Sequence, residues 1–177
     1  MSRADLASCG DVLNVHYGDI LIKYGSILDV ESNKIPYIAT GKENKKQCYL
    51  SDGDVIIADT AEDETVGKCT EIINIRDAKI EAGLHTIPCH PQTAYVPMYL
   101  GYYMNSPHYH KQLVPLMQGV KVLSVSKSNI GNTLISAPVS YSEQEKIVKM
   151  LYLLDIRMCK QQEIIEALKK YKRGVMQ

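Results

Sequence analysis

Hydrophobic and polar positions follow two different periods along the chain, and the change falls near residue 97. Before it, short runs of β-forming residues are separated by turn residues, a pattern that is typical of strands. Two of these runs, Ile20–Ile22 and Val55–Ile57, each follow a Gly-Asp pair. The same reasoning predicts three further strands, over Ile35–Ile38, Thr70–Ile75 and Leu84–Ile87.

After residue 97 the apolar positions recur at helical spacing, which predicts a short helix with Tyr99, Leu100, Tyr103 and Met104 on one face. Ser106 followed by Pro107 is a typical helix start, with serine as N-cap and proline in the first turn. We expect this second helix to end at Gly119. A strand over Val120–Val125 and a capped turn over Ser126–Ile130 follow.

The last segment carries the strongest helical signal. Ser142 and Glu145 have the spacing of a capping box, and residues 142–173 contain neither glycine nor proline. At ~1.5 Å per residue, this predicts a helix roughly 48 Å long. Its apolar positions alternate at spacings of four and three, as in a coiled coil: Ile147, Leu151, Leu154, Met158, Gln161, Ile165 and Leu168, continued by Lys172 and Val175.

Such a helix either folds back on its own domain or pairs with another helix. We favour pairing, because the helix is longer than the surface of a domain of this size, and we expect a homodimer. Gln161 is a polar residue in the middle of the apolar positions. A buried polar residue at such a position costs stability and fixes the register of the pair.

Charge divides the chain into two halves. The 177 residues have a formal net charge of +0, but residues 1–110 hold 9 basic and 15 acidic side chains, and residues 111–177 hold 11 and 5. A protein that binds nucleic acid by itself is usually basic overall. The balance therefore indicates weak DNA binding by the chain alone, binding within an assembly that adds positive charge, or simple attraction between the two halves.

Targeting signals and cysteine motifs are missing from the sequence. No apolar run reaches the ~18 residues of a membrane span, and the first residues do not resemble a signal peptide. The 5 cysteines form no Cys-x-x-Cys pair, so they predict neither a zinc knuckle nor a redox pair. We expect a soluble, cytoplasmic protein with no membrane partner.

Catalytic motifs are also missing. The sequence has no phosphate-binding loop, no Gly-x-Gly dinucleotide fingerprint and no Gly-x-Ser-x-Gly elbow. His85, Cys89 and His90 are clustered in the sequence, and His108 and His110 open a helix. A zinc site would need three or four such ligands to converge. The flanking prolines favour an ordinary loop, and we expect neither a metal nor another cofactor.

Three groups of residues resemble the type I restriction–modification specificity subunits. The first is the helix start after Pro138, with Glu143-Gln144, Lys146-Ile147, Leu151, Leu154-Asp155, Leu168-Lys169 and Lys172-Arg173-Gly174. The second resembles the end of their target recognition domains, with Tyr103, Ser106-Pro107, Gly119, Leu123-Ser124 and Asn129-Ile130. The third is a strand-and-loop motif, with Gly53-Asp54-Val55-Ile56-Ile57 and Val66-Gly67-Lys68.

The resemblance implies sequence-specific binding of double-stranded DNA by a non-catalytic subunit. Methyltransferase subunits and an ATP-dependent restriction subunit carry the chemistry in that family. Its members usually have two recognition domains, separated and followed by long helices that pair antiparallel. With one domain and one helix, this chain resembles a half subunit, whose symmetric dimer would read a bipartite target.

We therefore expect an α+β fold, with a mixed-strand target recognition domain over residues 1–140 and a long helix over residues 141–177 for antiparallel coiled-coil pairing. The helix positions from Ile147 to Leu168 would form the dimer. Side chains on loops would read base edges or hold phosphates. The candidates are Lys23, Lys42, Asn44, Lys45, Lys46, Lys68, Lys121 and Lys127. Two alternatives are a coiled-coil adaptor whose globular domain binds protein, and a metal hydrolase that uses the region from His85 to His90.

Overall fold

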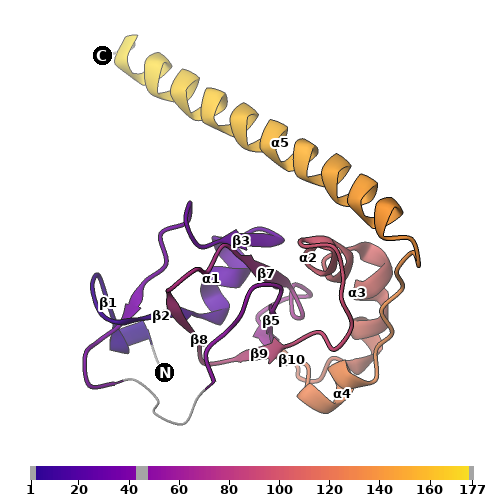
Figure 1. The fold of residues 1–177 in the computed structure, drawn as a ribbon. Coiled ribbons are helices and arrows are strands. Elements are labelled where there is room, and N and C mark those ends of the chain that lie inside the picture. Colours follow the sequence, from indigo (N-terminus) through magenta and orange to yellow (C-terminus); the bar gives the residue numbers. More distant parts are fainter. Residues whose placement is uncertain (1–2, 43–47, 176–177) are drawn as a thin grey trace. The chain divides into compact units, whose positions relative to one another are not determined.

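The computed structural model describes residues 3–42 and 48–175. The chain divides into two compact units, Met1–Ala137 and Pro138–Gln177. The first unit contains short strands and short helices, and the second consists mainly of one long helix (Figure 1). The α+β class predicted from the sequence is confirmed, as is the long C-terminal helix.

Two four-stranded sheets, both of mixed direction, form the framework of the first unit. Sheet A has the order β1-β4-β2-β8, and sheet B has the order β3-β7-β5-β9. The pairs β2–β8 and β3–β7 are parallel, and the other pairs are antiparallel. The strands of sheet A are β1 (Leu6–Ala7), β2 (Val12–Val15), β4 (Tyr37–Ile38) and β8 (Lys79–Ala82). Those of sheet B are β3 (Ile27–Asp29), β5 (Val55–Ala58), β7 (Cys69–Ile73) and β9 (Thr86–Cys89).

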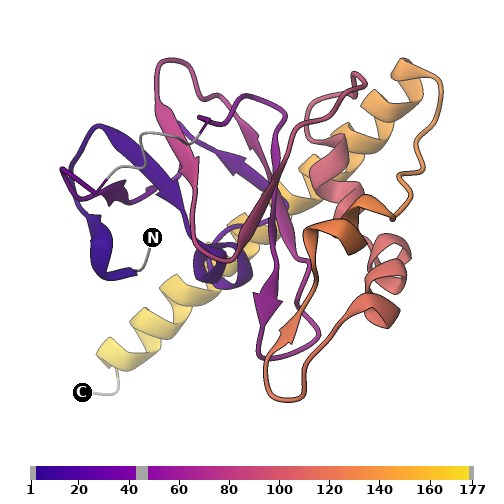
Figure 2. The ribbon, with the colours of Figure 1, turned by 90° about the horizontal axis from the view of Figure 1, so that it is seen from below.

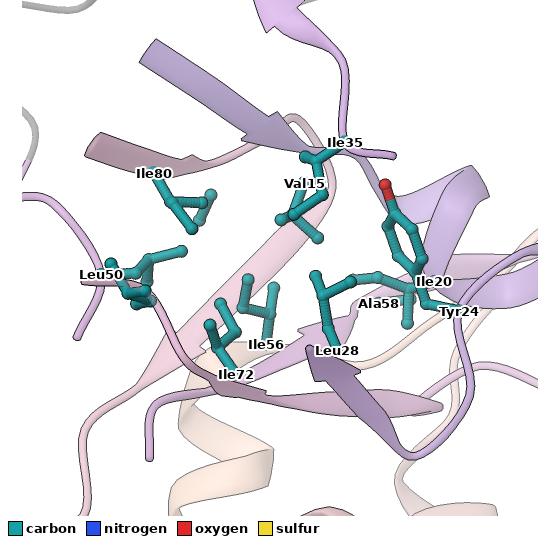
Figure 3. Packing of buried hydrophobic residues seen from close by; sticks show 12 residues of the cluster. Val15, Ile20, Tyr24, Leu28, Ile35, Leu50, Ile56, Ala58, Ile72 and Ile80 are labelled. Atoms are coloured by element: carbon teal, nitrogen blue, oxygen red, sulfur yellow. The ribbon is translucent and has the colours of Figure 1, made fainter. Parts of the chain in front are cut away.

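The main hydrophobic core joins these two sheets (Figure 3). Sheet A contributes Val15 and Ile80, and sheet B contributes Leu28, Ile56 and Ile72, all fully buried. Burying an aliphatic side chain of this size is worth roughly 1.5–3 kcal/mol. The core therefore holds the two sheets together through residues that are far apart in the sequence.

Three α-helices lie on the other side of sheet B, as Figure 2 shows: α2 (Tyr99–Met104), α3 (Pro107–Leu113) and α4 (Lys127–Gly131). A two-stranded sheet pairs β6 (Thr60–Ala61) with β10 (Leu123–Ser124). Two 3₁₀ turns complete the unit, η1 (Arg3–Asp5) and η2 (Val114–Leu116).

A buried carboxylate fixes the start of α2. Glu71 on β7 is 2% exposed, and its two oxygens accept hydrogen bonds from the backbone N–H of Met98, at 2.6 Å, and of Gly101, at 2.7 Å. These donors belong to the first turn of the helix, where backbone N–H groups have no partner within the helix. Gly101 leaves room for this contact, because a Cβ there would lie 2.8 Å from the Cβ of Glu71.

The strand predicted over Ile20–Ile22 is wrong. Residues Tyr17–Ile22 form helix α1, and the Nδ1 atom of its N-cap, His16, accepts the N–H of Gly18 at 3.2 Å. Ile20 and Tyr24 are buried while Ile22 is 86% exposed, which is the burial pattern of a helix and not of a strand. The Gly18-Asp19 pair therefore lies in the first turn of a helix and does not precede a strand.

Several predicted boundaries also move. The second helix ends at Leu113 and not at Gly119, because Pro115 lacks the N–H that a continuing helix needs. The strand predicted over residues 120–125 is reduced to β10, and the strand predicted over residues 84–87 begins at Thr86, after a turn in which His85 has a φ of 54°. The strand predicted over residues 70–75 is observed as β7, which ends at Ile73 because Asn74 has a φ of 60°, and the strand predicted over residues 35–38 is reduced to β4. The strand at 55–57, the helix at 99–104 and the Ser106 N-cap are confirmed.

The long helix, α5, covers Tyr141–Val175. The helix begins at residue 141, as predicted, but its N-cap differs from the predicted one by two residues, since Ser140 and not Ser142 caps it. The hydroxyl of Ser140 accepts the N–H of Glu143 at 3.4 Å. Ser140 and Glu143 have the same spacing as Ser142 and Glu145, so the sequence contains two overlapping capping boxes and the helix begins at the earlier one.

Candidate nucleic-acid interface

The Gly-Asp motif before β5 forms a turn. Gly53 has a φ of 85°, a conformation that favours glycine. Asp54 is 6% exposed, and its carboxylate accepts the N–H of Ser51 at 2.8 Å and contacts Nδ1 of His90 at 2.6 Å. The motif thus ties the start of β5 to the end of β9, and its two residues are used within the fold.

The Val-Gly-Lys motif is likewise part of the framework. Gly67 has a φ of 86° and donates its N–H to the carbonyl of Ala58 at 2.8 Å. The ammonium of Lys68 donates to the carbonyl of Leu21, at the end of α1, at 2.8 Å. Burial lowers the pKa of Lys68 below its ordinary value. These contacts favour a structural role for Lys68 over its predicted contact with DNA.

Lys23 also lies at the end of α1, as its C-cap. Its exposed ammonium donates to the carbonyl of Lys34 and lies 4.9 Å from the centre of the Tyr24 ring. Lys23 and Lys34 both line a surface cavity of about 300 Å³ beside Leu6–Ser8. This places two lysines at one hollow of the surface. Sequence reasoning missed Lys34, because a single lysine before Ile-Pro carries no signal of its own.

Lys42 borders the same N-terminal segment. Its ammonium lies 3.8 Å from the carboxylate of Asp5, and the side chain is 64% exposed. An exposed ion pair of this kind contributes little stability and can be exchanged for a phosphate. The other residues predicted in this loop, Asn44, Lys45 and Lys46, lie outside the described residues.

Lys121 and Lys127 lie elsewhere, on either side of β10, and both are exposed. Because β6 and β10 are antiparallel with Ala61 opposite Leu123, the acidic residues 62–64 after β6 run beside the residues just before β10. Hydrogen bonds from Thr65 lower the pKa of Asp63 in this loop. The acidic loop would repel phosphate near Lys121, which makes it a weaker candidate than Lys23 or Lys42.

The histidine and cysteine residues near β9 occupy separate environments. His85 lies 3.4 Å from Asp59, and His90 contacts Asp54. Burial raises the pKa of the Cys89 thiol. Among the residues that the structure describes, no group of three or more His, Cys, Asp or Glu side chains is arranged to hold a metal ion. The geometry gives the metal-hydrolase alternative no support.

The predicted dimer residues lie along α5 and expose a large part of their side chains. The exposed fraction is 50% for Leu154, 67% for Met158, 43% for Ile165 and 61% for Leu168. Ile147 and Leu151 are half-buried, and Gln161 is exposed. In the described part of the chain, no helix has the length and apolar character needed to cross a membrane.

The comparisons with known proteins identify the class. The family model for the type I restriction modification DNA specificity domain matches residues 5–170, which cover most of both structural units. A search of curated proteins finds no match. The chain therefore belongs to the type I restriction–modification DNA specificity family, as the motifs in the sequence predicted.

Proposed function

We propose that this chain is the specificity subunit, or a half subunit, of a type I restriction–modification system and selects the DNA sequence on which the other subunits act. The family match carries this proposal, because it extends over nearly all of the first unit, called the recognition unit below, and nearly all of α5. In this proposal residues 1–140 bind DNA, residues 141–177 pair with another helix, and the chain itself catalyses nothing and needs no cofactor. It acts in the cytoplasm.

The proposed partners supply what the chain lacks. Methyltransferase subunits and an ATP-dependent restriction subunit would carry the chemistry. Because the chain has a formal net charge of +0, we expect these partners to supply part of the contact with DNA phosphates. The binding of the chain alone should therefore be weak and strongly dependent on salt.

The proposed target is bipartite. Two copies paired through α5 would carry two identical recognition domains, and a two-fold dimer of identical subunits reads a two-fold symmetric sequence. Antiparallel pairing attaches the domains near opposite ends of the paired helices. The target would then be an interrupted palindrome with unread base pairs between its two half-sites.

A selection of bound DNA sequences, done with and without the cognate methyltransferase subunit, tests this function. We expect enrichment of one interrupted palindrome, with higher affinity when the methyltransferase is present. Enrichment of a single asymmetric site would contradict the homodimer. No enrichment under either condition would favour the alternative function, a coiled-coil adaptor that binds protein.

The DNA contacts are proposed at Lys23 and Lys42, together with Lys45 and Lys46. Neutralising Lys42, Lys45 and Lys46 together should weaken binding to all sequences equally and lower the salt slope by about one unit for each of these lysines that holds a phosphate. The exposed Lys111 on α3 gives a control, because Lys111→Gln also removes a positive charge but from another element of the fold. Unchanged binding by the triple variant would remove the loop from the interface.

A further inference from the structure

We propose that the recognition unit binds a guanine nucleotide in a cavity beside sheet A. The cavity has a volume of about 490 Å³ and is lined by Asn14 of β2 and Glu81 of β8, by Asp5 and Lys42, and by the turn that contains His85. All its lining residues belong to the recognition unit, so this inference does not depend on the dimer proposed above.

Asn14 and Glu81 are the two most buried polar side chains that line the cavity. They are partners in the parallel pair of β2 and β8, and each is 1% exposed. The adjacent residues on the same strands, Val15 and Ile80, point into the core between the sheets (Figure 3). Because successive side chains of a strand point to opposite faces, Asn14 and Glu81 lie on the face of sheet A away from that core. An amide and a carboxyl are thus buried side by side at this cavity.

The side-chain oxygen of Asn14 lacks a hydrogen-bond partner within the described ranges 3–42 and 48–175. Its Nδ2 atom donates to the carbonyl of Glu81 at 3.5 Å, which is a long contact. Native proteins rarely leave a buried acceptor unsatisfied. Gly83 also lines the cavity, and a Cβ there would lie 2.7 Å from Oδ1 of Asn14. The missing side chain therefore keeps this oxygen open to a ligand that donates a hydrogen bond.

The chemistry of the two side chains selects the ligand. Oδ1 of Asn14 is an acceptor, and an ionised Glu81 is an acceptor that can receive several hydrogen bonds. Neighbouring acceptors fit neighbouring donors. Among the four DNA bases, guanine alone presents two adjacent donors on its Watson–Crick edge, the ring N1–H and the exocyclic N2 amino group. Glu81 would accept N1–H and one amino hydrogen, and Asn14 would accept the other amino hydrogen.

Basic side chains at the same cavity favour a nucleotide over other ligands with paired N–H donors. Lys42 lies 3.8 Å from Asp5 and is 64% exposed, and His85 is 47% exposed. Lys42, together with His85 when it is protonated, would attract the phosphate of a nucleotide. The guanidinium of an arginine offers similar N–H donors but carries a positive charge, which Lys42 would repel.

Calorimetric titration of the full chain with nucleoside monophosphates tests the site. GMP should bind, and IMP, which lacks only the N2 amino group, should bind at least about tenfold more weakly, because Oδ1 of Asn14 then stays unpaired. AMP should not bind. Equal affinities for GMP and IMP would overturn the proposal. Binding of arginine amide with no binding of GMP would also overturn it and would identify a guanidinium site.

A second titration distinguishes a free nucleotide from a guanine within DNA. The ligand is a single-stranded thymidine oligonucleotide with one central guanine, and the control has hypoxanthine at that position. If GMP does not bind but the guanine oligonucleotide binds at least about tenfold more tightly than its control, the site takes a guanine from DNA. If neither titration distinguishes guanine from hypoxanthine, the proposal is wrong.

Two variants assign the contacts to residues. Asn14→Leu, which removes the acceptor at similar volume, should lower the affinity for GMP to that for IMP, and circular dichroism reports whether the variant is folded. Lys42→Gln is an exposed change that should weaken GMP several-fold and leave guanosine unchanged. Lys111→Gln on α3 is its control and should leave both affinities unchanged. Asn14→Leu that is folded and still prefers GMP to IMP would overturn the assigned contact.

This result is separate from the proposed function. Selection of an interrupted palindrome without any guanine preference in these titrations would refute the guanine site alone. Guanine binding without selection of any DNA sequence would refute the proposed function and leave this site in place.

Discussion

Replacing Glu71 by glutamine tests whether a buried carboxylate holds helix α2 on sheet B. Both oxygens of Glu71 accept backbone N–H groups, from Met98 at 2.6 Å and from Gly101 at 2.7 Å. Glutamine has nearly the same shape but only one oxygen. Its NH₂ group must therefore face one of the two N–H donors, so that one hydrogen bond disappears and two donors oppose each other.

The size of the effect follows from these contacts. A hydrogen bond to a charged group contributes about 1.5–3 kcal/mol, and an unsatisfied buried donor costs about 1–3 kcal/mol. Burial raises the pKa of Glu71, so the neutral amide regains part of the desolvation cost of the carboxylate. The net loss should be about 2 kcal/mol, which corresponds to a fall in Tm of about 4–8 °C for a chain of this length.

Thermal unfolding followed by circular dichroism measures this change. Glu64→Gln is the matched control, since Glu64 is exposed in the loop after β6, and its Tm should stay within about 1 °C of the wild-type value. If Glu71→Gln unfolds at the wild-type temperature while its spectrum is unchanged, the carboxylate does not hold α2 and the reasoning above is wrong.

Three further changes have clear expected outcomes. Gly67→Ala should lower the free energy of unfolding, measured by chemical denaturation, by about 1–3 kcal/mol, because φ is 86° and the new Cβ would overlap Leu113. Gly25→Ala is the control and should leave the free energy of unfolding nearly unchanged, since no atom lies within 4 Å of its new Cβ. Thr70→Val should raise the free energy of unfolding by about 1 kcal/mol, since the buried hydroxyl of Thr70 has no hydrogen-bond partner in the described residues. A lower free energy of unfolding would contradict this. Leu154→Glu should convert the proposed dimer to a monomer in sedimentation without changing the Tm of the recognition domain, and a dimer that persists would exclude this helix from the interface.

Local signals in the sequence were sufficient for some elements and not for others. Ser106-Pro107 and the uninterrupted helix after Ser140 depend on neighbours within a few residues, so their positions could be predicted to within about two residues. Ile20–Ile22 has strand-forming residues but lies in α1, because the His16 cap and the burial of Ile20 and Tyr24 outweigh propensity. A side chain that caps its own helix is harder to recognise when it is histidine.

The site residues were harder to predict because their surroundings come from distant parts of the chain. Lys68 is an ordinary loop lysine in the sequence, and only the fold brings it to the carbonyl of Leu21. Lys34 becomes a candidate for DNA contact only because the fold places it beside the same cavity as Lys23. The buried Glu71 could not be distinguished from a surface glutamate, since its partners follow it by about thirty residues.

In the proposed dimer, charge and pairing together would explain how a chain of this composition selects DNA. The recognition unit has 12 basic and 15 acidic side chains, and the second unit has 8 and 5. One recognition unit therefore has little general attraction for phosphates, and its affinity for a half-site must come mainly from a few well-placed side chains. Joining two such units through α5, as proposed, would make the second binding event intramolecular, which can raise the overall affinity by orders of magnitude with the same interface on each half-site. Weak binding by each single domain would then favour the proposed bipartite target, because a site with only one correct half would bind poorly.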